Sequence, residues 1–278
     1  MQTRRLTAAG IETHCLIAGP VEAPPVLLLH GGGLDRAALA WSETMRALQP
    51  TFRCYAPDLP GYGSSGGFAG PHDLGQLTDW ALALMDELGV ARAHVVGNSM
   101  GGGIALRLGL DHPERVDRLV PVGAYGLAPR YIGQPALWVL ARFGSSRLVS
   151  ATAARWELAA RAALRWVYAD PKQITPEVLA GLREEARRQL RRQSFRRFLM
   201  AEAAPTAFRS AMLDRLPQME RPTLLIHGTS DRIVPIRHAR RAARLAPQIE
   251  LYEMPVGHWP MRERPEIFLS KLRAFLTD

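Results

Sequence analysis

The chain has 278 residues, of which 47% are apolar and 22% charged, so it has enough apolar side chains for a large buried core and is not a disordered chain. No apolar run approaches the roughly 20 residues needed to cross a bilayer, which excludes a membrane span. The net charge of +9 is confined to the segment from Arg130 to Arg221, where 17 basic residues outnumber 8 acidic ones.

The residues near the N-terminus lack the apolar stretch of a secretory signal, so we expect a cytoplasmic protein. Cys15 and Cys54 are too few for a disulfide framework, and we expect both to be small buried hydrophobes. They indicate no metal site, and no motif indicates a cofactor. The sequence leaves the oligomeric state open.

In the first half of the chain, short apolar runs alternate with longer amphipathic segments, the rhythm of strands connected by helices. Leu77, Leu84 and Leu88 recur at helical spacing, and Gly89 is expected to end that helix. The predicted strands are Ile11–Ala18, which is expected to open the sheet, followed by Val26–His30, Phe52–Pro57, His94–Gly97 and Val116–Val122.

The rhythm resumes at Pro222, with strands at Thr223–Ile226 and Ile249–Met254 and helices near Ile236–Leu245 and Pro265–Leu276. We therefore predict an α/β fold in which a mostly parallel central sheet is flanked by helices. The predicted core domain comprises residues 1–128 and 222–278, and residues 129–221 form a helical insertion.

The strongest local motif is Gly97-Asn98-Ser99-Met100-Gly101-Gly102, which lies between a predicted strand and a predicted helix. A sharp strand-to-helix turn exposes a serine hydroxyl to a base, and the small neighbours relieve the crowding. The new helix also directs its first free N–H groups at the same place, where an oxyanion would form.

Three other segments fit this motif. His30-Gly31-Gly32-Gly33 ends an early strand, and its glycines allow a backbone N–H to approach a bound carbonyl oxygen. Asp231 and His258 each follow a later strand, so the chain order is Ser, Asp, His. In an open parallel sheet, such loops share the edge where ligands bind.

These motifs, together with Asp58-Leu59-Pro60-Gly61-Tyr62-Gly63-Ser64-Ser65, resemble the α/β-hydrolase fold family over nearly the whole chain outside the insertion. The resemblance implies a helical cap at 129–221 and a small-molecule substrate. It further implies that Ser99 is the nucleophile, His258 the general base and then acid, and Asp231 the partner that orients His258. The oxyanion hole would use the N–H groups of Met100 and Gly32, with Gly33 as the alternative, and the substrate site would include Gly33, Asn98 and Trp259.

Other polar residues receive structural interpretations. His30 and His227 are expected to be packed, hydrogen-bonded scaffold residues, and Asp58 to cap the turn at Gly61–Ser64. Asp214 is a weaker rival to Asp231 because it precedes the strand.

The insertion contains an arginine-rich helix, and Leu182, Ala186 and Leu190 form an apolar stripe along it. We therefore interpret its arginines as a solvated face rather than a nucleic-acid site, with Glu184 paired to Arg188. An alternative is that one or two cap arginines point inward and bind a substrate carboxylate. Five aromatic residues are expected either to line a pocket or to form the core of the cap: Trp138, Trp156, Trp166, Phe195 and Phe198.

A serine at the nucleophile position favours acyl transfer, so we predict an enzyme that hydrolyses carboxylic esters of small to medium substrates through an acyl-enzyme on Ser99. An alternative is a carbon–carbon bond hydrolase that acts on ring-fission dienoates. The residues that follow the oxyanion glycines differ from those of that branch of the family: this chain has Leu34-Asp35-Arg36-Ala37 where the branch has Gly-Pro-Gly-Ala. Its carboxylate-binding arginine has only an uncertain counterpart in Arg183. A third possibility is a non-catalytic ligand receptor.

Overall fold

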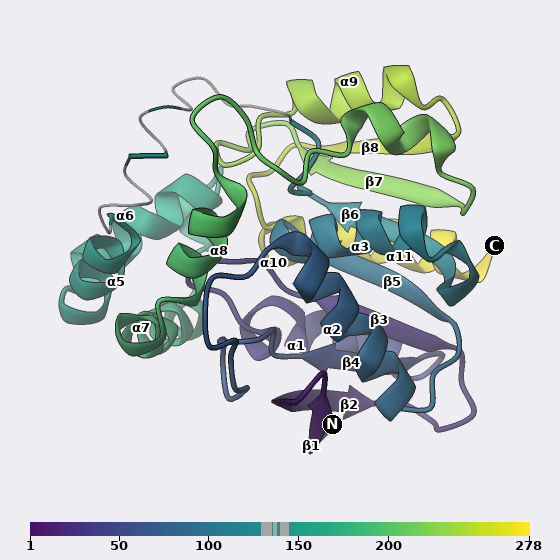
Figure 1. Ribbon diagram of the computed structural model, residues 1–278, viewed down its shortest axis with the longest axis horizontal. Coiled ribbons are helices and arrows are strands. Elements are labelled where there is room, and N and C mark those ends of the chain that lie inside the picture. The colour runs from purple at the N-terminus through teal and green to yellow at the C-terminus, as the bar shows by residue number, and fades with distance from the viewer. Residues whose placement is uncertain (129–134, 136–137, 140–144) are drawn as a thin grey trace.

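The centre of the computed structural model is an eight-stranded sheet with the strand order β1-β2-β4-β3-β5-β6-β7-β8 (Figure 1). The structure describes residues 1–128, 135, 138–139 and 145–278. The strands β3 to β8 run parallel, whereas β2 pairs antiparallel with both β1 and β4. This arrangement confirms the predicted α/β class with a mostly parallel sheet.

The predicted strands are all present, and their ends differ from the predicted ones by at most two residues. Their bounds are β2 (Ile11–Ala18), β3 (Pro25–Leu29), β4 (Arg53–Pro57), β5 (Ala93–Asn98), β6 (Val116–Val122), β7 (Thr223–Gly228) and β8 (Ile249–Met254).

The expectation that Ile11–Ala18 opens the sheet is wrong, because β1 (Gln2–Ala8) precedes it and pairs with it as a hairpin. Four residues of β1, from Gln2 to Arg5, are exposed, so this edge strand lacks the continuous apolar run used to recognise the others.

Helices cover both faces of the sheet. One face packs against α2 (Leu74–Glu87), α3 (Met100–Asp111), α9 (Arg237–Leu245) and the 3-10 helix η3 (Leu213–Gln218). The other packs against α1 (Ala37–Leu48), the short α10 (Pro260–Glu263) and α11 (Pro265–Thr277). A second 3-10 helix, η1 (Pro113–Arg115), leads into β6. The central strands are therefore buried on both sides, which explains their unbroken apolar sequences.

Between β6 and β7 the chain leaves the sheet and forms the helical insertion, which lies to one side of the sheet in Figure 1. Its described helices are α5 (Ser145–Arg155), α6 (Glu157–Val167), α7 (Pro176–Arg192) and α8 (Ser194–Glu202), with the 3-10 helix η2 (Pro171–Gln173) between α6 and α7. Thr175 caps α7 by accepting a hydrogen bond from the Val178 N–H, and Gln193 in the left-handed conformation separates α7 from α8.

The aromatic residues of the insertion do not share one environment. Phe198 is buried, whereas Trp156 and Trp166 are 57% and 61% exposed, so the expectation that these two tryptophans belong to a core or pocket is wrong. Trp138 is partly buried against the core. Cys15 and Cys54 are buried free thiols, as predicted.

No helix in the described ranges is both long and apolar enough to cross a membrane.

Candidate active site

Ser99 lies at the sharp turn between β5 and α3, with φ 53° and ψ −112°. Its N–H donates to the Val122 carbonyl at 2.8 Å, while its own carbonyl accepts from Gly103 N at 3.0 Å and from Tyr125 N at 2.9 Å. A positive φ is unfavourable for a residue with a Cβ, and it persists here because these bonds hold the turn from three sides. The predicted strand-to-helix elbow is therefore present.

The start of α3 lies against the end of β3. A Cβ at Gly101 would lie 2.2 Å from the Leu29 carbonyl oxygen, a separation that no side chain tolerates. The Gly101 N–H also donates to the His30 carbonyl at 3.1 Å. A glycine at position 101 thus allows the helix that follows Ser99 to dock on the strand that leads into the glycine loop.

His258 and Asp231 form a hydrogen-bonded pair, with 2.7 Å between His258 Nδ1 and Asp231 Oδ2. The other carboxylate oxygen of Asp231 accepts from the N–H groups of Ile233 and Val234, both at 2.8 Å. Burial alone would raise the pKa of Asp231, but the charge and hydrogen bond of His258 outweigh it, so the pKa lies below the ordinary value. The carboxylate is ionised and fixed in direction, which suits it to orient an imidazole.

Asn98 connects the serine turn to the histidine loop. With its amide oriented to match its neighbours, Asn98 donates to the His258 carbonyl and accepts from Trp259 Nε1, each at 3.2 Å. The His258 N–H in turn donates to the Val167 carbonyl at the end of α6, at 2.6 Å. The backbone of His258 is thus held by both the core and the insertion.

Buried Glu263 adds a second connection at the same place. Its carboxylate accepts from Gly257 N at 2.8 Å, Ala169 N at 3.1 Å and Asp170 N at 2.8 Å. Gly257 directly precedes His258, whereas Ala169 and Asp170 follow α6, so Glu263 joins the histidine loop to the insertion.

The glycine loop after β3 is supported from behind by Asp35. Its Oδ2 accepts from Gly31 N at 2.9 Å and its Oδ1 from Arg36 N at 2.8 Å. Burial raises the pKa of Asp35 to about 7, more than these hydrogen bonds lower it. Gly33 has φ +75°, a conformation that a side chain would disfavour.

A cavity of about 260 Å³ brings most of the predicted site residues together. From the core it is lined by Gly31, Gly32, Gly33, Leu34, Asn98, Ser99, Ile233, His258 and Trp259, and from the insertion by Val149, Ala163, Val167, Leu182 and Phe195. Met100 is not among these lining residues. It is buried and begins α3, so its N–H is one of the free donors at that helix start. The insertion therefore supplies an apolar roof over Ser99.

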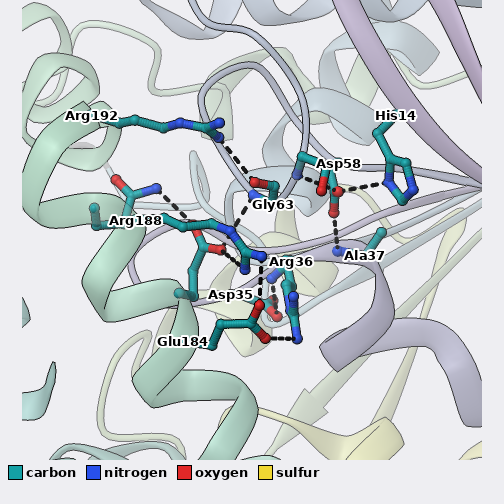
Figure 2. Close-up of polar contacts among 12 residues, drawn as sticks. His14, Asp35, Arg36, Ala37, Asp58, Gly63, Glu184, Arg188 and Arg192 are labelled. Carbon is teal, nitrogen blue, oxygen red and sulfur yellow. Dashed lines mark hydrogen bonds and ion pairs between the residues drawn. The ribbon is translucent and has the colours of Figure 1, made fainter.

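Helix α7 docks on the turn that follows β4, as Figure 2 shows. Asp58 organises this turn by accepting from Ser64 N at 2.9 Å, as predicted, and it also binds His14 Nδ1 and Ala37 N. From α7, Arg192 donates to the Gly63 carbonyl at 3.0 Å.

The prediction that the arginines of the insertion form only a solvated face is wrong for several of them. Besides Arg192, Arg197 donates to the Phe68 carbonyl at 2.7 Å. Arg188 pairs with Glu184 as predicted, at 2.6 Å, but Glu184 also binds Arg36 of the core at 2.7 Å (Figure 2). The arginines thus attach the insertion to the core.

Two buried polar residues of α7 were missed by the sequence analysis. Leu182 and Ala186 are buried as the apolar stripe predicts, but Glu185 and Gln189 are buried beside them. Glu185 accepts from Gly63 N at 3.3 Å and Gln189 donates to the Gly61 carbonyl at 3.0 Å. Burial raises the pKa of Glu185 to about 7. The feature of the sequence that could have indicated their burial is the position of both residues next to the apolar stripe.

The other histidines singled out above have structural surroundings. His30 is fully buried and its Nε2 accepts from Leu59 N at 2.9 Å, and burial lowers its pKa to about 4. His227 is buried and lies 2.7 Å from the Val234 carbonyl through Nε2. Both are scaffold residues, as predicted. In the part of the chain that the structure describes, no three His, Cys, Asp or Glu residues are grouped in a way that could hold a metal ion.

A family model described as alpha/beta hydrolase fold matches residues 24–265. Among curated proteins, the chain is 31% identical to a 2-hydroxymuconate semialdehyde hydrolase of Pseudomonas putida over 286 aligned residues, covering 99% of this chain and 94% of that protein.

Solved structures agree with this result. A meta-cleavage product hydrolase from Pseudomonas fluorescens superposes with a TM-score of 0.81 at 26% identity, covering 99% of this chain and 97% of that one. An enol-lactonase from Burkholderia xenovorans gives a TM-score of 0.80 at 25% identity, covering 99% of this chain and all of the other.

Proposed function

Because the chain belongs to the alpha/beta hydrolase fold family, we propose that it hydrolyses a carbon–carbon bond in a ring-fission dienoate, with Ser99 as nucleophile. The observation that carries this choice is the 31% identity, across nearly the full chain, to a protein named as a 2-hydroxymuconate semialdehyde hydrolase. Carbon–carbon cleavage, which the sequence suggested as the alternative reaction, thus becomes the first candidate in place of ester hydrolysis.

In the proposed reaction, His258 takes the hydroxyl proton of Ser99 while the serine oxygen attacks the carbonyl carbon of the substrate. Asp231 holds the imidazole 2.7 Å away and stabilises the positive charge that forms on it. The N–H groups of Met100 and Gly32, with Gly33 as the alternative donor, bind the oxyanion. Each such donor contributes on the order of a hundredfold to a thousandfold in rate.

Before this attack the dienoate must ketonise: its 2-hydroxyl loses a proton and the carbon next to the reacting carbonyl gains one, because cleavage of the dienol form would leave an unstabilised vinyl anion. The tetrahedral intermediate then breaks its bond to this now saturated carbon, which departs as a conjugated enolate and receives the proton from His258. An acyl group remains as an ester on Ser99. Water, deprotonated by His258, attacks this ester, and the acid product leaves with regeneration of the serine hydroxyl.

The carboxylate of such a substrate requires a cation at some distance from Ser99. Arg183 is a poor candidate, because its Nη1 lies 3.9 Å from Glu157 Oε2 and so faces a carboxylate of the protein. Its neighbour Leu182 lines the Ser99 cavity, whereas Arg183 is not among the lining residues. Arg147 and Arg196 line a second cavity that shares Gly33 with the first. In this proposal, one or both of them bind the carboxylate, which is the inward-facing role considered for the cap arginines.

Ester hydrolysis is the second candidate, and the apolar roof formed by Val149, Ala163, Val167, Leu182 and Phe195 favours it. An uncharged acyl chain would fit beneath this roof without a cation. The chemistry at Ser99 is the same, except that an alcohol leaves in place of the enolate.

A substrate panel separates the two candidates. The purified chain is assayed with a ring-fission dienoate, with the methyl ester of its carboxylate, and with p-nitrophenyl acyl esters. We expect kcat/KM to be highest for the free dienoate and to fall at least about tenfold when its carboxylate is masked, since an arginine pair is lost. If kcat/KM is higher for the acyl esters than for the dienoate, the proposed function becomes ester hydrolysis and not carbon–carbon cleavage.

The Ser99→Ala variant tests the shared nucleophile. Its kcat should fall by roughly 10⁴-fold or more for every substrate, because no acyl-enzyme can form. Substantial turnover by this variant would overturn both candidates, and failure of wild-type Ser99 to react with a fluorophosphonate would point to a receptor.

A further inference from the structure

Phe195 lies at the boundary between two cavities. The first is the cavity that contains Ser99. The second has a volume of about 240 Å³ and lies between α5, α7 and α8, with Arg147, Gln193 and Leu199 among its lining residues. Both cavities are lined by Gly33, Leu34, Val149 and Phe195.

The Phe195 ring lies directly against the glycine loop. A Cβ placed on Gly32 would be 2.8 Å from the ring Cδ2 and 2.9 Å from Cε2, so the ring occupies the space where a side chain at position 32 would be. Gly32 also contributes one of the N–H groups assigned above to the oxyanion. The ring therefore narrows the way from the Ser99 cavity into the second cavity, beside the place where the reacting carbonyl would lie.

The ring is held in place by the beginning of α8. Ser194 donates from Oγ to the Gly61 carbonyl at 2.9 Å, and its N–H donates to Gln189 Oε1 at 3.0 Å. Phe195 stacks on Phe198 with centroids 6.4 Å apart and planes 16° apart. Phe198 is 1% exposed and packs edge-on against Tyr125. Rotation of the ring out of the boundary would break this stack.

We propose that Phe195 is a specificity-determining residue, whose ring limits how far a substrate group extends from Ser99 toward the second cavity. This inference rests on the proposed nucleophile, and it holds for either bond that the enzyme cleaves. A thin, planar chain passes beside the ring, while a bulkier or longer saturated chain is excluded because a packed aromatic side chain does not yield.

The test uses alkyl fluorophosphonates of increasing alkyl length, because they react with a serine nucleophile whatever bond the natural substrate contains. The rate of labelling is measured for each probe, and mass spectrometry verifies that Ser99 carries the adduct. For the wild-type chain, we expect the rate to rise with length and then to decline once the alkyl group reaches the ring.

In the Phe195→Ala variant, the decline should move to longer probes. Each methylene that gains a buried position is expected to increase the labelling rate roughly fourfold, so a shift of two or three methylenes gives at least a tenfold change in the ratio of long to short probes. The Phe195→Leu variant, which keeps an apolar side chain, should shift in the same direction to a smaller extent and serves if the alanine variant does not fold.

Leu199→Ala is the matched control, because Leu199 lies on the same helix and lines the second cavity without lining the first. This substitution enlarges the second cavity but leaves the Phe195 ring at the boundary, so the dependence of the labelling rate on probe length should equal that of the wild-type chain. An unchanged profile in both Phe195 variants, or an equal shift in Leu199→Ala, would overturn the inference. The Ser99→Ala variant must not label, and labelling there would instead overturn the proposed nucleophile.

Discussion

Asn98 immediately precedes the proposed nucleophile, and its amide connects two consecutive residues of the histidine loop, His258 and Trp259. It has no exposed surface, so both of its hydrogen bonds are shielded from water. The geometry gives this residue a positioning task that its motif does not reveal. In G-x-S-x-G, position 98 is written as any residue, whereas the tertiary structure requires a side chain that both donates and accepts.

Asn98→Ala should therefore impair the reaction through the position of His258. We expect kcat to fall roughly 10- to 100-fold, because small displacements of a catalytic group carry penalties of that order, while KM changes little. Steady-state kinetics on the best substrate of the panel checks this expectation, with the melting temperature measured in parallel. An unchanged kcat in a folded variant would show that the loop holds His258 without this amide.

At the scale of elements, the activity depends on how the first turn of α3 meets the end of β3. Ser99 has a strained backbone at the point where α3 begins directly after β5. A helix can approach the Leu29 carbonyl this closely only if its second residue, Gly101, lacks a side chain. The strained serine and the glycine are two consequences of one packing requirement.

Gly101→Ala should both lower stability and abolish activity, because its Cβ would overlap the Leu29 carbonyl and push α3 away from the sheet. Gly103→Ala is the comparison in the same helix, since its Cβ would lie 3.2 Å from both Cδ1 and the carbonyl oxygen of Tyr125, a tight contact but not an overlap. We expect the melting temperature to fall by several degrees in the first variant and to fall less in the second. Equal melting temperatures and activities for the two variants would contradict this account.

The buried face of helix α7 includes polar residues that its apolar stripe does not predict. The stripe through Leu182 and Ala186 predicts the buried face correctly, yet Glu185 and Gln189 are buried on the same side. They are tolerated because the core presents backbone groups of Gly61 and Gly63 at these positions. A pattern of apolar residues contains no information about polar partners that come from more than a hundred residues earlier in the chain.

For the whole molecule, two of the buried carboxyl groups near the contact between core and insertion, Asp35 and Glu185, have raised pKa values. Burial raises the pKa of each to about 7, from ordinary values near 4. Arg36 and Arg188 lower the pKa of Glu185, whereas Asp58 raises it, and His258 lowers that of Asp35. Between pH 4 and 7 each of these two groups thus binds more protons in the folded chain than in the unfolded chain, so its own contribution to stability decreases as the pH rises through this range. The histidines whose pKa values burial lowers, among them His30 and His227, contribute in the opposite direction.

We therefore predict that Glu185→Gln raises the melting temperature relative to the wild-type chain, and that it does so more at pH 8 than at pH 5.5. Glutamine keeps the shape and the acceptor for Gly63 but never becomes charged, so the variant should gain stability mainly at pH 8. Glu184→Gln is the control, because Glu184 is partly exposed and its arginine neighbours hold its pKa below the ordinary value despite some burial. A Glu185→Gln variant with the same pH dependence as the wild-type chain would contradict the prediction.

Much of this architecture follows from local patterns. Parallel strands buried on both faces have largely apolar sequences, so central strands such as β3, β5 and β7 are recognisable one at a time, while the exposed edge strand β1 is not. The serine turn, the glycine loop and the two loops with Asp231 and His258 are recognisable because each follows a strand. Their meeting at one cavity follows from the parallel direction of the strands.

The α/β class and the position of the helical insertion could be predicted from the amino-acid sequence, and so could candidates for the triad, because these depend on periodicity and on motifs of adjacent residues. The sequence did not reveal that several arginines attach the insertion to the core, that Asp35, Glu185 and Glu263 are buried beside the site loops, or that Phe195 lies between two cavities. Each of these properties depends on a partner distant in the chain, and its energy depends on the burial that this partner provides.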